Sequence, residues 1–576
     1  MSLPYLTTRA CIAVLAIATG VLLSACQVPL KYFEIPLNAE LSEDYAANVL
    51  VRGVPLKGIH GLTVTKDGKL LVGSVVGASI YQIAHQSKRN YGDWKLLYAP
   101  PEGMADDLAQ GPDGTLVWTA FLEGKVYGRS PSQKTPYVIA EGLPGVNALA
   151  FDQNGRLFVS RVFLADDLYE MDITGQTEPR LIMSGMGGLN GFDFGPDNKL
   201  YGPLWFKNKL VRIDVDTAEI EDIASISGIP AAVQFDSQGH LWVIDTQKGQ
   251  LLSLEPNADE AGFYSVPHFR LQLQPALDNL AIGKNDEVFI TNMSNNSVVR
   301  YIPEQDDLEV LIESPLAVVG GIASGSWQGR QVLYLADVFA LRRVEVSTGR
   351  IQTLARVFGS HIDYPLHVAV TPDQTQLVLT SWSAGKIQLF DLVENKIIHS
   401  LDATTPQGTV VLEDGRILWV ETVTGRLMRA DSALAQAETL SANLSGPEDL
   451  AVSAGRLYVL ESASGQLISL DLDGQNPKVL ARDLQRAEGI TALPDGKLVV
   501  VDAAADQVLL FSEPSADNSD QAIWNRNILA EGLKLDDLAA ASSLSTGVPV
   551  GVASDSEGRV YLGSNNLATI YILEKR

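Results

Sequence analysis

The stretch Gly61–Ser74 reads GLTVTKDGKLLVGS, and its pattern decides the fold. An apolar segment enters a tight polar turn, and a second, β-branched apolar segment leaves it. The pattern returns in about twelve copies that start roughly 40 to 47 residues apart, which is the length of one four-stranded blade of a β-propeller. Five further copies are clear: DLAQGPDGTLVWTA (107–120), ALAFDQNGRLFVSR (148–161), GFDFGPDNKLYGPL (191–204), GITALPDGKLVVVD (489–502) and GVASDSEGRVYLGS (551–564).

Each copy predicts four short strands. In the first copy we expect strands over 61–65, 69–73, 78–83 and 94–98, with a tight turn at 66–68. Asp-Gly between alternating apolar residues indicates a hairpin with a type I′ turn, in which both central residues have positive φ. Helical periodicity is scarce. The main exception is 515–545, where QAIWNRNILAEG and LDDLAAASSL suggest short inserted helices.

The repeat count favours two tandem six-bladed propellers, because radial repeats usually close at four to eight blades. We expect an N-terminal propeller over 43–319 and a C-terminal propeller over 320–576, with an insertion around 513–548. The last repeat has only three strands, and Asn48–Gly53 resembles the outer strands elsewhere. Pairing this segment with the last blade would remove exposed edges. One large ring, or interleaved propellers closed by the N-terminal strand, remains the alternative.

The N-terminus carries a leader. Arg9 precedes the apolar stretch CIAVLAIATGVLLSAC, which is too short for a comfortable membrane span and typical of a secretory signal over 1–25. Its end, Leu23–Cys26, resembles the lipobox of bacterial lipoproteins. This resemblance implies cleavage before Cys26, acylation of Cys26 with fatty acids such as palmitate, and a lipidated tether over 26–42. In that family Gln27, not being Asp, favours the outer membrane, with the protein facing the periplasm. An ordinary signal with a chance cysteine is the alternative.

The composition limits the kinds of partner and site that this protein can have. The net charge of −26 excludes the phosphates of nucleic acid and anionic lipid surfaces as natural partners, since both would be repelled. Cys11 and Cys26 are the only cysteines, so a lipidated chain has no thiol left for a disulfide or a thiolate metal site. No Gly-x-Ser-x-Gly elbow, phosphate loop, zinc histidine pair or dinucleotide fingerprint is present.

Residues at blade starts meet around one axis. In the first six repeats Ala231 is the only apolar residue of this column, which reads His60, Asp106, Asn147, Asn190, Ala231 and Asp278. Asp and Asn oxygens suit calcium or magnesium. The same residue types also cap turns by bonding their own backbone, so a structural role is the alternative.

Three phrases carry a family resemblance. Val146–Asp152 and Leu189–Asp197 resemble blade starts of the senescence marker protein/gluconolactonase family, an NHL-like group, and Leu277–Ala281 is similar to a phrase of paraoxonases. The resemblance implies six-bladed propellers with a central divalent metal, often calcium, that open lactones or esters. It assigns Asn147, Asn190, Asp278 and Asn279 as metal ligands, and puts Asp106 and Asp107 in the place of an acidic pair. His60 or Asp106 would then activate water.

The second six repeats present a different column, which reads Gly320, Leu366, Gln407, Glu448, Glu488 and Val550. Glu448 and Glu488 are a candidate ligand site. Glu421, Glu461 and Asp502 follow second strands, and in so acidic a chain we expect such residues to be solvated surface acids.

Two functions remain. The favoured one is a non-catalytic, outer-membrane-anchored periplasmic lipoprotein whose propellers bind a small molecule or an envelope protein. The alternative is a calcium-dependent lactonase or esterase in the N-terminal propeller. Binding is favoured because Ala231 interrupts the ligand column, and because the Asp278-Asn279 phrase comes one blade later than the family pattern requires.

Overall fold

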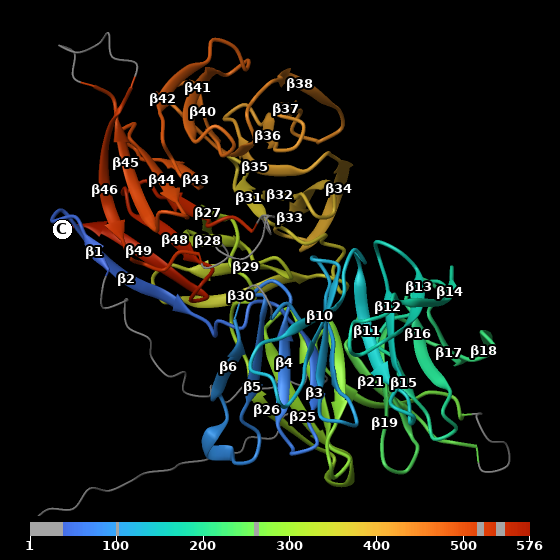
Figure 1. Cartoon of the computed structure of the whole chain (residues 1–576). Coiled ribbons are helices and arrows are strands. Elements are labelled where there is room, and N and C mark those ends of the chain that lie inside the picture. Colours follow the sequence, from blue (N-terminus) through green and yellow to red (C-terminus); the bar gives the residue numbers. More distant parts are fainter. Residues whose placement is uncertain (1–38, 100–102, 258–263, 515–522, 537–547) are drawn as a thin grey trace, which may run out of the picture.

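The computed structural model describes residues 39–99, 103–257, 264–514, 523–536 and 548–576. Its regular structure is almost entirely strand, arranged as twelve antiparallel sheets that radiate like blades (Figure 1). Two 3-10 turns, η1 (Lys88–Asn90) and η2 (Pro303–Gln305), are the only helical elements in these ranges. No helix in the described part of the chain is long and apolar enough to cross a membrane. Cys26, the leader and most of the tether lie outside the described residues.

Blades 1 to 6 form from consecutive strands. Each blade begins with its innermost strand and ends with its outermost one: β3 (Ile59–Val64), β4 (Leu70–Ser74), β5 (Ser79–Ile83), β6 (Trp94–Tyr98); β7 (Leu108–Gln110), β8 (Leu116–Ala120), β9 (Lys125–Arg129), β10 (Tyr137–Ala140); β11 (Val146–Phe151), β12 (Leu157–Arg161), β13 (Asp167–Met171), β14 (Arg180–Ser184); β15 (Asp193–Phe194), β16 (Leu200–Leu204), β17 (Lys209–Asp214), β18 (Glu219–Ser225); β19 (Pro230–Phe235), β20 (Leu241–Asp245), β21 (Gln250–Leu254), β22 (His268–Gln272); β23 (Leu277–Ile282), β24 (Val288–Asn292), β25 (Ser297–Ile302), β26 (Asp307–Ile312).

Blades 7 to 12 follow, and the last two recruit N-terminal strands: β27 (Ile322–Trp327), β28 (Arg330–Ala336), β29 (Ala340–Glu345), β30 (Arg350–Arg356); β31 (His367–Val370), β32 (Gln376–Ser381), β33 (Lys386–Asp391), β34 (Lys396–Asp402); β35 (Pro406–Val411), β36 (Ile417–Glu421), β37 (Arg426–Ala430), β38 (Ala437–Ser441); β39 (Pro447–Ser453), β40 (Arg456–Glu461), β41 (Gln466–Asp471), β42 (Lys478–Ala481); β43 (Ala487–Ala492), β44 (Leu498–Asp502), β45 (Gln507–Ser512), β46 (Asn525–Glu531), β1 (Glu40–Leu41); β47 (Val552–Ser554), β48 (Val560–Ser564), β49 (Thr569–Lys575), β2 (Tyr45–Arg52).

The sheets close into two rings. In the first ring, β23 and β24 of blade 6 pack against β3 of blade 1, and the Thr291 hydroxyl donates to the His60 carbonyl over 2.7 Å. In the second ring, β47 and β48 of blade 12 pack against β27 of blade 7. Each closure has its own apolar core: Leu56, Ile59 and Phe289 belong to the first, and Val51, Leu333 and Tyr561 to the second. A single twelve-bladed ring is therefore excluded.

The N-terminal strand completes the last blade. Strand β2 pairs antiparallel with β49, in a register that sets Tyr45 opposite Lys575 and Arg52 opposite Thr569. The segment therefore supplies the missing outer strand, which is the closure expected in the alternative of interleaved propellers closed by the N-terminal strand. Residues 45–52, which the sequence-based boundary at residue 43 assigned to the N-terminal propeller, thus belong to blade 12, and β1 adds a fifth strand to blade 11.

Two local expectations were wrong. In the first hairpin the backbone N–H of Gly68 donates to the carbonyl of Thr65, so Lys66 and Asp67 are the central turn residues, and only Gly68 has positive φ (+79°). The turn is a type I turn followed by a left-handed glycine, which also suits a twisted hairpin. The segment 525–531, expected to be helical, is strand β46, because its backbone pairs with the edge of β45 and this pairing buries Leu529 and Ala530.

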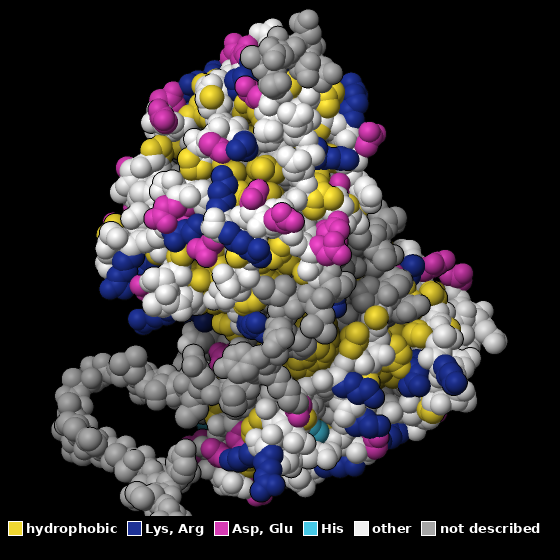
Figure 2. All heavy atoms as spheres, turned by 90° about the vertical axis from the view of Figure 1, so that its left-hand side faces the viewer, with side chains coloured by type: hydrophobic (Ala, Val, Ile, Leu, Met, Phe, Trp, Pro, Cys, Tyr) yellow, Lys and Arg dark blue, Asp and Glu magenta, His cyan; other side chains and the backbone are white. Residues whose placement is uncertain are grey.

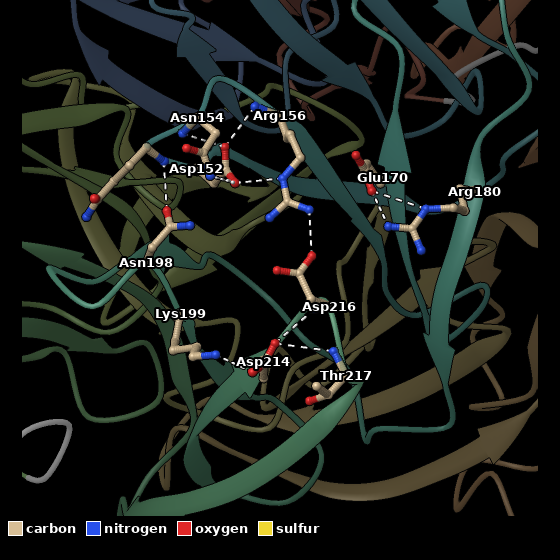
Figure 3. A network of polar contacts seen from close by, with 11 residues as sticks. Asp152, Asn154, Arg156, Glu170, Arg180, Asn198, Lys199, Asp214, Asp216 and Thr217 are labelled. Carbon is tan, nitrogen blue, oxygen red and sulfur yellow. Dashed lines mark hydrogen bonds and ion pairs between the residues drawn. The ribbon is translucent and has the colours of Figure 1, made fainter.

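Polar contacts join neighbouring blades at the face opposite the one where the innermost strands begin. Arg156 lies in the β11–β12 turn of blade 3, and its guanidinium bonds both Asp152 of the same turn and Asp216 of blade 4, the latter over 2.7 Å (Figure 3). The backbone N–H of Gln153 donates to Asn198 Oδ1 over 2.9 Å. Basic and acidic side chains are interspersed on the face shown in Figure 2, despite the net negative charge.

The first testable prediction concerns ring closure. Deleting residues 39–52 removes β1 and β2 and leaves the edges of β46 and β49 unpaired, so blades 11 and 12 should lose hydrogen-exchange protection while β11–β18 keep theirs. Deleting residues 1–38 is the control and should change neither region. Unchanged protection of β47–β49 in the chain that lacks residues 39–52 would contradict this closure.

Candidate functional site

The blade starts of the first ring gather at one end of its axis, which we call the first mouth. It contains His60 on β3, Asp106 before β7, Asn147 on β11, Asn190 before β15 and Asp278 on β23. All but Asp278 and His60 are at most 9 % exposed, and those two are partly exposed. The column that the repeat predicted is therefore brought together in space.

Asp106 and Asn147 contact each other across a blade boundary, since the Asn147 amide nitrogen lies 2.5 Å from Asp106 Oδ2. Burial raises the pKa of Asp106, the charges of Asp278 and Asp107 raise it further, and His60 opposes the rise. Burial likewise raises the pKa of Asp278. Removing a carboxylate from water disfavours its charged form, so these groups hold protons at a pH where a surface aspartate does not.

His60 has the opposite tendency. Burial lowers its pKa, although Asp106 and the Gly58 carbonyl favour the charged ring. Its Nδ1 lies 2.9 Å from the Gly58 oxygen, which can only accept a hydrogen bond. In the neutral ring the proton therefore resides on Nδ1, leaving Nε2 as an acceptor.

Asp107 and Asn279 are structural braces. Asp107 accepts hydrogen bonds from the backbone N–H groups of Leu108 and Leu149, and from the Asn279 amide over 2.8 Å. Asp107 is in blade 2 and Asn279 in blade 6, so their bond spans the intervening blade 1. Burial raises the pKa of Asp107 to about 7, and its hydrogen bonds limit the rise.

The same brace recurs where no ligand site was predicted. Asp193 accepts from the backbone N–H groups of Phe194 and Phe235, and Asp449 from those of Leu450 and Ile490. In each case an inner-strand carboxylate joins two neighbouring blades. These residues therefore have the structural role that was the alternative to a metal site. Each carboxylate accepts hydrogen bonds from backbone N–H groups of two neighbouring blades.

The metal set implied by the family resemblance assembles only in part. Asn190 Oδ1 accepts from the Gly191 N–H and Asn279 Oδ1 from the Leu280 N–H, so both oxygens are used by the backbone. Ala231 lies in an apolar core. Within the described ranges no three His, Cys, Asp or Glu side chains are placed to hold a metal ion. The remaining oxygens, on Asp106, Asp278 and Asn147, suit a divalent cation in kind but are few.

Residues of the second ring form a roof over the first mouth. This aromatic roof consists of Phe339 in the β28–β29 turn, and Phe358 and Tyr364 in the segment between β30 and β31. Phe339 lies 5.4 Å from the His60 ring and 6.0 Å from the Tyr364 ring. Burial raises the pKa of Tyr364, and the carboxylates of Asp278, Asp363 and Asp106 add to the rise.

The roof is fixed to the first ring by buried polar bonds. Arg342 forms an ion pair with Asp337 and donates to the Ser294 carbonyl of blade 6, and both charged residues are almost fully buried. Asp337 also accepts from the Ala317 N–H over 2.7 Å. Since breaking a buried pair leaves an uncompensated charge, these contacts hold the β28–β29 turn in place.

An apolar rim continues outward from the roof. Trp205 contacts Phe358 at 5.3 Å and Phe163 at 5.2 Å, and Phe163 lies 5.8 Å from Phe206. The rim itself is Phe163, Leu164 and Phe206, which are 45 %, 62 % and 60 % exposed. These residues lie in the turns after the second strands of blades 3 and 4, on the same face as the first mouth.

Each ring encloses a polar channel along its axis. The first, of about 220 Å³, is lined by residues such as Lys66, Asp107, Gln110 and Asn279. The second, of about 370 Å³, is lined by residues such as His367, Asp449, Glu488 and Thr491. The bond between Asp107 and Asn279 lies where the first channel meets the first mouth.

Glu488 lines the second channel, and Glu448 lies close enough for its charge to act on Glu488. Glu448 accepts from the Ser462 hydroxyl over 3.0 Å, and burial raises its pKa to about 7. Glu488 is paired with Arg486 at 2.6 Å and accepts from the Val550 N–H, while burial raises its pKa. Both carboxylates therefore have partners within the ring.

The three acids after second strands are not solvated, contrary to expectation. Glu421, Glu461 and Asp502 end β36, β40 and β44 and are buried. They accept backbone N–H groups of the loop entering their own blade, from Thr404, Ser445 and Gln485 respectively. Burial is compensated because an ionised carboxylate accepts several such bonds.

The residues that the sequence did not indicate are those of the roof. The roof belongs to the other ring. Its residues Phe339, Phe358 and Tyr364 are about 300 residues from His60 along the chain. No local pattern marks them, since isolated aromatic residues in loops are common.

The comparisons with known proteins assign no family to this chain. No protein-family model and no characterised relative matches the chain. It is similar to a streptogramin B lyase structure (16 % identity, 55 % of this chain and 99 % of the other, TM-score 0.36) and to virginiamycin B lyase from Staphylococcus aureus with quinupristin (14 %, 50 % and 95 %, TM-score 0.36). It is also similar to the extracellular domain of a protein assigned to a one-component system of B. thetaiotaomicron (12 %, 92 % and 83 %, TM-score 0.32). At these TM-scores the similarities assign no activity to this chain.

The buried acids predict a pH dependence of stability. A carboxyl whose pKa is raised on folding takes up a proton in the folded state, so its contribution to the free energy of unfolding falls as pH rises from the unfolded pKa near 4 through the folded value. For Asp107 this window ends at about pH 7. Asp278→Asn should reduce the fall by up to about 1.4 kcal/mol per pH unit. Denaturant unfolding between pH 5 and 8 measures it.

The control is Asp307→Asn, which removes an exposed carboxylate from the same blade. It should leave the pH slope as in the unsubstituted chain. If Asp278→Asn and Asp307→Asn give the same slope, Asp278 does not carry the proton.

Proposed function

We propose that this chain is a lipid-anchored envelope protein that binds a small molecule at the first mouth, beneath the aromatic roof. The observation that carries the proposal is the roof itself. Aromatic side chains of one ring are held over buried and partly exposed carboxyl, amide and imidazole groups of the other, and a few convergent polar groups in an apolar surround are typical of ligand sites. Binding at this place would use both rings.

The mouth groups support binding better than hydrolysis. Asp107, Asn190 and Asn279 already accept backbone or amide hydrogen bonds. Among the mouth residues that the structure describes, Asp106, Asp278, Asn147 and His60 each have a polar atom for which no hydrogen bond is found. These four residues are enough to orient a ligand. They are too few to hold a metal ion and also activate a water molecule.

The lipid anchor can be tested separately. Cys26 would carry the acyl chains, and two or more chains hold a protein to a bilayer where one does not. In a bacterial host, Cys26→Ser should move the protein from the membrane pellet to the soluble periplasmic fraction and abolish palmitate labelling. Cys11→Ser is the matched control and should leave labelling intact. Equal labelling of both variants would disprove anchoring at Cys26.

Native mass spectrometry of the purified chain tests ligand binding. We expect a bound organic mass in the unsubstituted protein, and at least tenfold less of it in Tyr364→Ala, because this change removes part of the roof. Tyr264→Ala, on the outer side of blade 5, is the control. Retention of the same mass in Tyr364→Ala would contradict a site beneath the roof.

The metal-dependent lactonase is a second candidate, favoured by the proximity of His60, Asp106 and Asp278 at one mouth. Calcium would be held by the oxygens of Asp106, Asp278 and Asn147, and would supply Lewis-acid polarisation of a carbonyl. His60 Nε2, the free acceptor, is the group able to take a proton from water. The same mass spectra decide this case, since it requires bound calcium that is lost in Asp278→Asn.

A further inference from the structure

The Asp278 carboxylate lacks a partner. In the described ranges no hydrogen bond or ion pair to it is found, and burial is the sole cause of its raised pKa. It is close enough to Asp106, Asp107 and Tyr364 to act on all three. Asp278 is only partly exposed, and a carboxylate that is partly removed from water without a partner is costly, so this position suits a compensating group.

Two of the acids near Asp278 have no compensating Lys or Arg. The charged and titratable groups that act most strongly at this mouth are Asp106, Asp107 and Asp363, together with His60. Asp363 is paired with Lys386 at 3.2 Å, whereas no Lys or Arg acts on Asp106 or Asp107. Because burial lowers the pKa of His60, that ring is a poor source of positive charge near neutral pH. The mouth is therefore complementary to a positive charge supplied from outside.

The walls are aromatic. Ring contacts run without interruption from His60 through Phe339, Tyr364, Phe358 and Trp205 to Phe163. Aromatic faces attract cations, most strongly where water is excluded, and their preferred guests are weakly hydrated organic ammonium groups. A small, strongly hydrated metal ion needs six or more oxygens, and the mouth offers few.

The exposed rim gives the site an apolar outer end. Phe163, Leu164 and Phe206 are continuous with the interface between the rings through the contact of Trp205 with Phe358. A ligand that reaches from Asp278 past Trp205 would place its distal part on this rim. Burying such a group removes apolar surface of both ligand and protein from water.

We infer that the ligand of the first mouth is an organic cation, with its ammonium group at Asp278 and Asp106 and an apolar or aromatic body against Trp205 and the rim. This inference rests on the proposed function, since it names the class of ligand for the same site. It commits to a small molecule, and a neutral or anionic ligand would contradict it.

The probe is phenethyltrimethylammonium, titrated calorimetrically into the full chain carrying Cys26→Ser. Its neutral isostere, in which tert-butyl replaces trimethylammonium, and phenylethanesulfonate, which is anionic, complete the series. We expect binding of the cation only.

Two substitutions locate the site. Asp278→Asn should weaken cation binding at least tenfold, whereas Asp307→Asn, on the same blade, should leave it unchanged. Phe206→Ser should weaken it several-fold through the rim. Asp278→Asn preserves shape and removes no hydrogen bond, so unfolding is not expected, and its circular dichroism spectrum verifies this.

Failure of this inference is distinguishable from failure of the proposed function. Equal binding of the neutral isostere, undiminished binding to Asp278→Asn, or no binding of the cation each overturns the organic-cation class. The proposed function stands or falls on the retained mass in native spectra. A neutral or anionic ligand that needs Tyr364 would keep the proposed function and reject the cation.

Discussion

Ring closure is the constraint on which the rest of this structure depends. A blade at the end of an open row would expose the apolar face of its sheet, and a blade without its outermost strand would expose an unpaired strand edge. Here β2 pairs with β49, so the two ends of the described chain meet in blade 12 (Figure 1). The first ring, which has no such exchange of strands, closes through side-chain contacts such as Thr291 with His60. It is carried as an insertion between β2 and β27.

This arrangement explains why the first mouth lies beneath the second ring. The chain leaves blade 12 at Arg52 and begins blade 1 at Ile59, then leaves blade 6 at Ile312 and begins blade 7 at Ile322. Two short connections therefore hold the rings together at the same place. Phe339, packed with Ala276 and Met293 of the first ring, shares a core with residues of both rings. The roof is thus a consequence of how the rings are joined.

Buried carboxylates serve two purposes in this molecule. Asp107, Asp193 and Asp449 join neighbouring blades by accepting backbone N–H groups, and their cost of burial is offset by those bonds. Asp278 has no comparable compensation. The presence or absence of hydrogen-bond partners therefore distinguishes a structural acid from a candidate binding acid. Burial does not distinguish them, because both kinds are desolvated. It also shows why a polar column at blade starts is not by itself a metal site.

Much of the fold was predictable from the sequence, because a blade is encoded locally. Alternating apolar residues and an Asp-Gly turn recur in GLTVTKDGKLLVGS and its copies, and they specify strands whose pairing is with the next strand along the chain. The column of blade starts, and the pairing of Asn48–Gly53 with the last blade, followed from the same period. The turn type did not follow, because Asp-Gly also fits a type I turn with a left-handed glycine. Strand β46 was not predictable either, because its strand conformation depends on pairing with the edge of β45.

The sequence by itself determined that this is an all-β chain of propeller blades with polar residues around the first axis. Only the tertiary structure decided which of these residues brace the blades, and that Phe339, Phe358 and Tyr364 cover the mouth. The physical reason is the sequence separation over which each interaction acts. Strand and turn preferences act between residues close in sequence, whereas hydrogen-bond satisfaction and aromatic packing at the mouth join residues hundreds of positions apart.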